Sequence, residues 1–257
     1  MPQVTFLTKL KVKWDEGKFV CVGLDTADFA LNKSVIDQTC DLVCTYKPNS
    51  AFYEAEGIKG LESLKNTIDY IHQKDPNIPV ILDAKRGDIG NTNEGYVKMA
   101  FEQLGADAIT VSPYLGKESL EPFLNRTDKG IIVLVKTSNP GAGEFQDLEV
   151  YTERSRSGKP LYQVIAEHVK EWGENVGVVV GATYPEELKK VREIIGDMPI
   201  LIPGVGAQGG DISETVKAGL NSKNQGIIIS SSRGIIFADN PREATLKLHK
   251  EIVESLK

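Results

Sequence analysis

Acidic and basic residues alternate within one short segment, IPVILDAKRGDIGNTNEGY, which spans residues 78–96. Asp83, Lys85 and Asp88 follow an apolar, β-branched run, as expected where a buried strand ends. An ammonium group between carboxylates stays protonated, because opposite charges nearby favour the ionised form. Such a lysine can stabilise developing negative charge and then donate a proton. The spacing predicts a catalytic site, and the alternative is a salt bridge that merely closes the strand.

Two earlier strand ends favour the shared site over the salt bridge. The run FVCVGLD ends in Asp25, and LVCTYKPN reaches a charge at Lys47. Because strand side chains alternate, Asp83 and Lys85 are expected on one face, pointing inward. Asp25 and Lys47 are expected on the corresponding faces of their own strands. Three consecutive strands would then deliver charges to one rim, where barrel enzymes carry their catalytic residues.

Glycines cluster near the end of the chain. The segments PGVGAQGGD, residues 203–211, and IIISSSRG, residues 227–234, each follow or include an apolar run. Glycine lets backbone N–H groups converge on an anion, Gln208 can donate from its amide, and Arg233 can hold two phosphate oxygens. Glycine clusters also occur in ordinary loops. Together with an arginine at the next strand end, they predict a phosphate site.

The elements that position these residues are short apolar runs separated by segments of helical periodicity. Continuous apolar strands that alternate with helices predict a parallel sheet covered by helices. Eight such units predict an α/β protein with a closed (β/α)8 (TIM) barrel, and a doubly wound open sheet is the alternative. The runs are Phe19–Leu24, Leu42–Tyr46, Val80–Leu82, Ala108–Val111, Ile131–Val135, Val176–Val180, Ile200–Ile202 and Gly226–Ile229.

The chain carries no linker or low-complexity stretch, which predicts one barrel domain over residues 1–257. The longest irregular segment, residues 138–160, is expected to be a functional loop on the catalytic face. Asn240 and Asp211 are expected to cap two late helices, since each precedes a glutamate by three residues. The last helix would bury an apolar stripe of Ala244, Leu248, Ile252 and Leu256.

Composition bounds the function. The formal net charge of −6 argues against a general nucleic-acid surface, but a few clustered cations can still bind a small anion. No apolar run approaches the roughly 20 residues that span a bilayer, and the N-terminus does not resemble a secretion signal. Cys21, Cys40 and Cys44 have no CxxC spacing and are expected to be reduced thiols. We therefore expect a cytoplasmic protein without nucleic-acid or membrane partners.

The segment DAKRGDIGNT resembles the DxKxxD signature of the orotidine 5′-phosphate decarboxylase family. PGVGAQGGD and SSRGIIFADNP resemble that family's phosphate-binding segments, and GLD, YKPN and TSNPG match its other strand ends. The motifs occur in the family's order from about Phe19 onward, and SNPGAGEFQD is typical of its longer-chain branch. The resemblance implies a TIM-barrel carboxy-lyase that converts orotidine 5′-monophosphate to UMP in pyrimidine biosynthesis, without a metal or other cofactor.

The resemblance also implies a role for each matching residue. Lys47, Asp83, Lys85 and Asp88 would form the catalytic charge network, with Lys85 protonating C6 of the pyrimidine. The family places Asp88, Ile89 and Thr92 in the partner subunit's site, which implies a homodimer with shared active sites. Asp25 and Lys47 would hold the ribose, Thr137 and Ser138 the pyrimidine, and Gln208 and Arg233 the phosphate. The implied substrate contacts are Asp25, Asn49, Ile89, Thr92, Thr137, Ser138, Pro203, Gln208, Ser232 and Arg233.

Two other functions fit part of the pattern. Magnesium-dependent sugar-phosphate decarboxylases and aldolases of the same barrel group carry a similar DxKxxD segment, with an additional carboxylate on the second strand. Here that strand ends in Lys47, which is poorly suited to bind a cation. A non-catalytic nucleotide-sensing barrel would not need Lys85 and its flanking acids. Metal dependence or binding without turnover would distinguish these alternatives.

Overall fold

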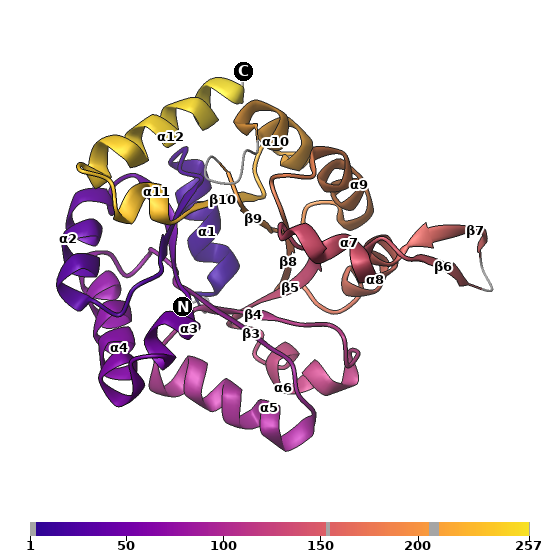
Figure 1. The fold of residues 1–257 in the computed structure, drawn as a ribbon, viewed down its shortest axis with the longest axis horizontal. Helices are drawn as coiled ribbons and strands as arrows, with labels where there is room; N and C mark the ends of the chain where they lie inside the picture. Colours follow the sequence, from indigo (N-terminus) through magenta and orange to yellow (C-terminus); the bar gives the residue numbers. More distant parts are fainter. Residues whose placement is uncertain (1–3, 153–154, 206–210, 257) are drawn as a thin grey trace.

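The computed structural model describes residues 4–152, 155–205 and 211–256. An eight-stranded sheet forms the centre of the molecule, and helices surround it (Figure 1). Each strand overlaps one of the apolar runs predicted from the sequence. The strands are β1 (Val20–Leu24), β2 (Val43–Pro48), β3 (Ile81–Arg86), β4 (Ala108–Val111), β5 (Gly130–Lys136), β8 (Val176–Val180), β9 (Ile200–Pro203) and β10 (Ile227–Ser231).

The sheet is parallel and nearly closes on itself. Its strand order is β2-β1-β10-β9-β8-β5-β4-β3, and each ladder between neighbours is parallel. The two end strands, β2 and β3, are joined by parallel bridges from Tyr46 to Val80 and from Asn49 to Asp83. The predicted (β/α)8 barrel is therefore confirmed, and the open doubly wound sheet is excluded.

The helices form the outer layer. Asn240 accepts a hydrogen bond from Glu243 N at 3.1 Å, so the predicted cap of the last helix is present. Asp211 caps its helix in the same way, from Glu214 N at 2.8 Å. The helices are α1 (Phe6–Asp15), α2 (Phe29–Thr39), α3 (Ser50–Glu54), α4 (Gly57–Lys74), α5 (Gly90–Val97), α6 (Glu121–Leu124), α7 (Gly143–Gln146), α8 (Leu161–Val169), α9 (Pro185–Ile195), α10 (Ile212–Gly219), α11 (Arg233–Ile236) and α12 (Pro241–Ser255), with short π or 3-10 segments η1 (Lys98–Gln103), η2 (Glu118–Leu120) and η3 (Pro140–Ala142).

Helix α1 covers the N-terminal end of the barrel. Trp14 Nε1 donates to the carbonyl of Ile227, at the start of β10, at 2.9 Å. Phe6 lies against Gly130, at the start of β5, where a Cβ would come within 2.3 Å of the Phe6 ring. Any larger residue at this position would require the Phe6 ring to move. With this end covered, the C-terminal ends of the strands remain as the accessible rim.

The segment after β5 differs from the prediction of one long irregular loop. Residues 138–160 contain η3, α7 and an antiparallel hairpin of β6 (Glu149–Thr152) and β7 (Ser155–Pro160), which projects away from the barrel (Figure 1). The sequence did not indicate this hairpin because its strands are mostly polar. A strand pair of mostly polar sequence lacks the alternating apolar face from which strands are recognised.

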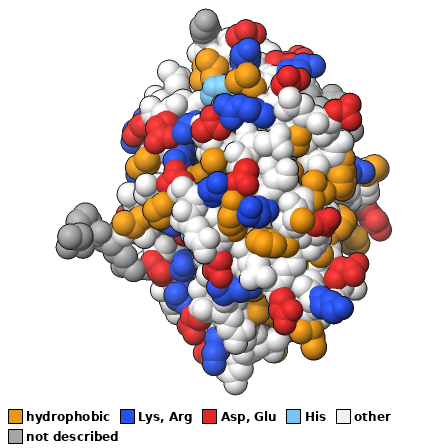
Figure 2. Space-filling model, turned by 90° about the vertical axis from the view of Figure 1, so that its left-hand side faces the viewer, with side chains coloured by type: hydrophobic (Ala, Val, Ile, Leu, Met, Phe, Trp, Pro, Cys, Tyr) orange, Lys and Arg blue, Asp and Glu red, His pale blue; other side chains and the backbone are white. Residues whose placement is uncertain are grey.

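The surface carries both signs of charge. On the side of the molecule formed by α2 and α4, acidic and basic side chains are interspersed (Figure 2). No helix within the described residues has the combination of length and apolar character that crossing a membrane requires.

Candidate active site

Three charged side chains from two adjacent strands meet at the C-terminal rim. Lys47 Nζ, near the end of β2, donates to Asp83 Oδ2 at 3.0 Å. Lys85 Nζ, two residues further along β3, donates to Asp83 Oδ1 at 2.6 Å. Lys47 and Asp83 are only 6% and 8% exposed, whereas the Lys85 side chain is 49% exposed. One carboxylate is thus shared by a buried and an accessible ammonium group.

The charges of this group stabilise one another. Burial alone raises the pKa of Asp83, but the positive charges of Lys47 and Lys85 outweigh burial and hold that pKa well below its usual range. Burial alone lowers the pKa of Lys47, but the negative charges of Asp83 and Asp25 outweigh it and raise that pKa above its ordinary value. At neutral pH, Asp83 is therefore a carboxylate and Lys47 an ammonium ion.

Strand β3 is irregular where the candidate catalytic lysine lies. It pairs with β4 at Ile81 and Leu82 and again at Arg86, with a shift in register between them. Lys85 has φ +47°, in the left-handed region that residues with a side chain rarely adopt. The simple alternation predicted beyond Asp83 is therefore wrong, and a bulge replaces it. Backbone strain of this kind collects at functional sites.

Thr110 on β4 lies beside the charged group of Lys47, Asp83 and Lys85. It was not identified as a site residue from the sequence. Its Oγ1 donates to Asp83 Oδ1 at 2.9 Å and accepts the N–H groups of Ala84 and Lys85 at 3.0 and 2.9 Å. The side chain is fully enclosed. The available signal was a single polar residue in the otherwise apolar run Ala108–Val111.

Asp25, at the end of the β1 run, lies beside the start of α11. Ser232 Oγ is 2.6 Å from Asp25 Oδ2, which accepts its hydrogen bond. The other oxygen, Asp25 Oδ1, is buried and has no hydrogen-bond partner within the described residues. Gly23 makes this approach possible, since a Cβ there would lie 2.7 Å from the Cβ of Ser232. A buried acceptor without a donor suits a hydroxyl group of a ligand.

A cavity of about 310 Å³ opens beside the charged group. Its lining combines charged side chains with the apolar side chains of Leu134, Val179 and Leu201. This combination suits a small molecule that has both charged and apolar parts. The full lining is Lys47, Asp83, Lys85, Thr110, Leu134, Thr137, Ser138, Asn139, Val179, Leu201 and Pro203.

Thr137 and Ser138 reach this cavity from the loop after β5. Gln146 holds the loop, because its Oε1 accepts the Thr137 N–H and its Nε2 donates to Thr137 Oγ1, both at 2.9 Å. Ser138 packs on Gly181 of the loop after β8, where a Cβ would lie 2.7 Å from the Ser138 Cβ. The loop therefore contributes polar groups to the lining of the cavity.

The structure does not bring Asp88, Ile89 and Thr92 into this group. Asp88 Oδ1 accepts the N–H of Ile89 at 2.7 Å, and no ion pair or hydrogen bond within the described residues joins Asp88 to Lys85. Ile89 is 63% exposed and Thr92 is exposed too. Asn49 uses its side chain to cap α3, accepting the Ala51 N–H at 3.2 Å. These residues face the surface of this chain or support its helices.

The predicted substrate contacts after β9 and β10 are described only in part. Pro203 ends β9 and lines the cavity. Ser232 precedes α11, and Arg233 begins it with an exposed side chain that forms no ion pair within the described residues. Gln208 lies outside the described residues. Arg233 is thus an available cation beside the Asp25 side of the rim.

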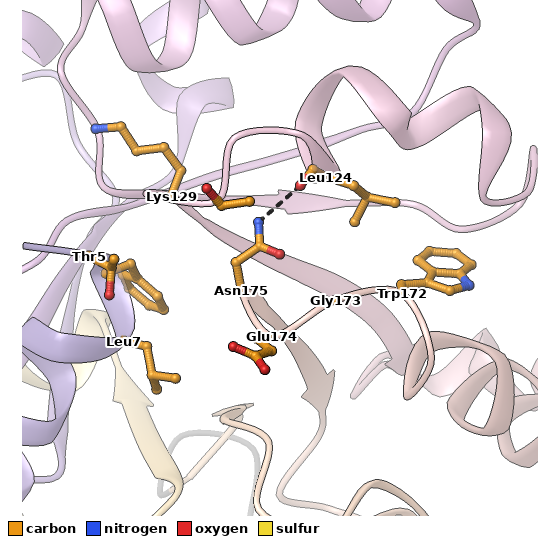
Figure 3. A pocket seen from close by; sticks show the side chains of 10 residues that line it. Thr5, Leu7, Leu124, Lys129, Trp172, Gly173, Glu174 and Asn175 are labelled. Carbon is orange, nitrogen blue, oxygen red and sulfur yellow. Dashed lines mark hydrogen bonds between the residues drawn. The ribbon is translucent and has the colours of Figure 1, made fainter. Parts of the chain in front are cut away.

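A different hollow, of about 430 Å³, lies at the covered end of the barrel, beside α1 (Figure 3). Of the residues that line it, only Lys129 and Glu174 are charged, and Lys129 points away from Glu174 (Figure 3). Lys129 Nζ instead donates to the carbonyl of Ala106 at 3.0 Å. This hollow lacks the shared charges of the rim, which remains the candidate active site.

Comparison with known proteins places this chain in a family. The model described as the Orotidine 5′-phosphate decarboxylase / HUMPS family matches residues 18–248. The chain is 46% identical over 261 residues to the orotidine 5′-phosphate decarboxylase of Cupriavidus metallidurans, covering 95% of this chain and 93% of that protein. It is 47% identical over 251 residues to the orotidine 5′-phosphate decarboxylase of Ralstonia pickettii, covering 91% of this chain and 90% of that protein.

Solved structures agree. The structure of Leishmania donovani OMP decarboxylase matches with a TM-score of 0.90 at 38% identity, covering 98% of this chain and 99% of that one. Orotidine 5′-monophosphate decarboxylase from Methanocaldococcus jannaschii, solved with the inhibitor BMP, matches with a TM-score of 0.75 at 26% identity, covering 91% and 98%. The family model matches most of the chain, and two relatives share 46% and 47% of their aligned residues with it. This chain therefore belongs to the orotidine 5′-phosphate decarboxylase family.

Proposed function

We propose that this chain removes carbon dioxide from orotidine 5′-monophosphate and releases UMP. The observation that carries the proposal is the Lys47–Asp83–Lys85 network at the edge of a cavity, in a chain of this family. The network holds ammonium groups next to the place where negative charge would develop on the substrate during the reaction. The magnesium-dependent relatives are not favoured, because a cation, Lys47, stands at the end of β2.

Lys85 is the proposed proton donor. When the bond from C6 to the carboxylate breaks, its electron pair stays on C6 in an in-plane orbital with little resonance stabilisation. The barrier is therefore lowered mainly by a positive charge held nearby. Lys85 lines the cavity and is paired with Asp83, so its ammonium group can face the developing carbanion and then transfer a proton to C6.

The remaining residues are proposed to hold the nucleotide. Asp25, with its unpartnered buried oxygen, and Lys47 would hold ribose hydroxyls, with Asn49 nearby. Thr137 and Ser138 would contact the pyrimidine amide from the loop above the cavity. Binding energy from the distant phosphate can then position the base for reaction. The proposed phosphate side comprises Gln208, Arg233 and backbone groups near Ser232, and Pro203 is a further proposed substrate contact.

We also propose a homodimer in which Asp88, Ile89 and Thr92 complete the partner's site. In this chain no hydrogen bond or ion pair within the described residues joins Asp88 to Lys85, and Asp88 Oδ1 accepts the N–H of Ile89 instead. Ile89, Tyr114 and Leu115 are exposed apolar residues on the neighbouring loops that follow β3 and β4. Such exposed apolar side chains favour an interface. A cytoplasmic location remains a prediction from the sequence.

Subunit mixing tests the shared site. Lys85→Ala and Asp88→Ala subunits would each be inactive alone. After exchange, half of the dimers are mixed and each mixed dimer holds one intact site, so about a quarter of wild-type activity should return. Absence of recovery, with exchange verified by differently tagged chains, would show that Asp88 acts within its own subunit.

The main experiment follows the ultraviolet absorbance of orotidine 5′-monophosphate with purified chain in buffer that contains a metal chelator. Conversion to UMP is expected. A folded chain without turnover would contradict the proposed function, and recovery of turnover on a sugar phosphate with magnesium would support the related barrel enzymes instead.

A further inference from the structure

We propose that Thr110 is a positioning residue, which fixes both Asp83 and the backbone of Lys85 for the reaction. The inference rests on the proposed function, because it concerns how the charge network is held in place. Thr110 lies on β4 and is 1% exposed. It belongs to the strand next to the one that carries the network.

The single hydroxyl of Thr110 is fully used. Its oxygen is 3.0 Å from Ala84 N, 2.9 Å from Lys85 N and 2.9 Å from Asp83 Oδ1. A hydroxyl has one proton and two lone pairs, and a backbone N–H can only donate. Both lone pairs are therefore occupied by N–H groups, and the only proton is directed at Asp83. Thr110 Oγ1 must therefore be the donor, and Asp83 Oδ1 the acceptor, of the hydrogen bond between them.

The same hydroxyl stabilises the bulge in β3. In a regular strand consecutive N–H groups point to opposite sides, so one acceptor cannot bind both. The N–H groups of Ala84 and Lys85 converge on Thr110 where the register of β3 against β4 shifts, next to the φ of +47° at Lys85. A left-handed conformation is unfavourable for a lysine and needs support from its surroundings. Thr110 supplies that support by accepting the backbone N–H groups of Lys85 and of the residue before it.

Thr110 also fixes the carboxylate that holds Lys85. Asp83 Oδ1 accepts from Thr110 Oγ1 and from Lys85 Nζ, while Oδ2 accepts from Lys47 Nζ. The position of the Lys85 ammonium group thus depends on Thr110 twice, through its backbone and through its carboxylate partner. A displacement of about 1 Å in a reacting group can lower a rate about 100-fold.

The test compares Thr110→Val with Thr110→Ser. Valine keeps the shape but removes the hydroxyl, so kcat should fall roughly 10- to 100-fold. KM and the affinity for UMP should change by less than about threefold, because the binding groups remain. Serine keeps the hydroxyl, and kcat should remain within about threefold of wild type. This split between kcat and KM, with rescue by serine, would not follow from a loss of stability.

Thr45→Val is the matched control. Thr45 is fully buried in β2, and its Oγ1 donates to the carbonyl of Pro79 at 2.7 Å. Its loss should lower resistance to urea with little change in kcat. Wild-type kcat in folded Thr110→Val, or equal losses in the serine and valine variants, would overturn the inference.

If Thr110→Val does not fold, Thr110→Cys replaces it, since a thiol has a similar size but is a poor hydrogen-bonding group. A folded cysteine variant with wild-type kcat would overturn the inference as well. Wild-type chain is measured alongside. Its failure to turn over orotidine 5′-monophosphate would refute the proposed function, whereas equal turnover by wild type and variant refutes only the role of Thr110.

Discussion

Two lysines near the ends of barrel strands are buried, and each pairs with an aspartate, yet their surroundings differ. Lys47 on β2 contacts Asp83 inside the barrel and lines the cavity. Lys136 on β5 is 0% exposed and pairs with Asp147 in the following loop. Its ammonium group also lies 4.7 Å from the centre of the Tyr184 ring.

The two lysines differ in the surroundings of their aspartate partners. Asp83 is itself buried and is shared with Lys85, whereas the side chain of Asp147 is half exposed and, within the described residues, pairs with Lys136 alone. Lys136 also lies 5.6 Å from the centre of the Tyr162 ring of α8, which places it toward the helical layer. A buried lysine with an acidic partner is therefore not enough to indicate catalysis. The shared partner and the open cavity are the distinguishing features.

The largest effect is expected from Lys85, the accessible member of the shared pair. Lys85→Ala removes both the charge and the proton donor, so kcat/KM should fall about 10⁴-fold or more. The half-exposed side chain can be removed without leaving a cavity, so the fold should persist. Absorbance assays and circular dichroism would measure both. Substantial turnover by the folded variant would remove Lys85 from the mechanism.

The comparison becomes sharper when both lysines receive the same substitution. Lys47→Met removes a buried charge from the site and should lower kcat/KM roughly 10²- to 10³-fold. Asp83 would keep Lys85 as its partner, which limits the destabilisation. Unchanged kcat/KM in this variant would mean that Lys47, like Lys136, has only a structural role.

The sequence predicted the barrel because apolar strands and amphipathic helices repeat along the whole chain. It also indicated which strand ends carry Asp25, Lys47 and Asp83, since alternation and strand ends are local properties. It did not reveal the bulges, which depend on neighbouring strands. By alternation Lys136 would share the inward face of Leu134, but a register shift between β5 and β8 separates them.

Thr110 and Lys85 illustrate the same limit. Alternation alone placed Lys85 beside Asp83, but the structure achieves this through a left-handed residue and a hydroxyl from the next strand. Hydrogen bonds between strands distant in sequence leave only a weak local signal, here one threonine in an apolar run. The polar hairpin after β5 was missed for a related reason, because no apolar face marks it.

The free energy of unfolding should depend on pH through the carboxylate of Asp83, which pairs with Lys47 inside the barrel. The pKa of Asp83 is lowered in the folded chain, so its contribution is fully present above the unfolded pKa, near 3.9, and is lost as pH falls below it. Asp83→Asn should cost on the order of 2 kcal/mol of unfolding free energy at pH 7. Urea titrations should show the difference from wild type shrinking toward pH 3. A difference independent of pH would mean that Asp83 is not stabilised as a carboxylate.

The smallest effect on catalysis is expected from Lys136, whose burial is as complete as that of Lys47. Lys136→Met should change kcat/KM by less than about threefold, because the side chain lies toward the helices. Its unfolding free energy should fall by about 1–2 kcal/mol, since methionine packs between the tyrosines but loses the ion pair and the contacts between cation and ring. Urea titration and the absorbance assay would measure these two quantities. A loss of kcat/KM as large as that of Lys47→Met would show that Lys136 acts on the site through the loop that carries Ser138, and burial with an acidic partner would then be the better guide to function.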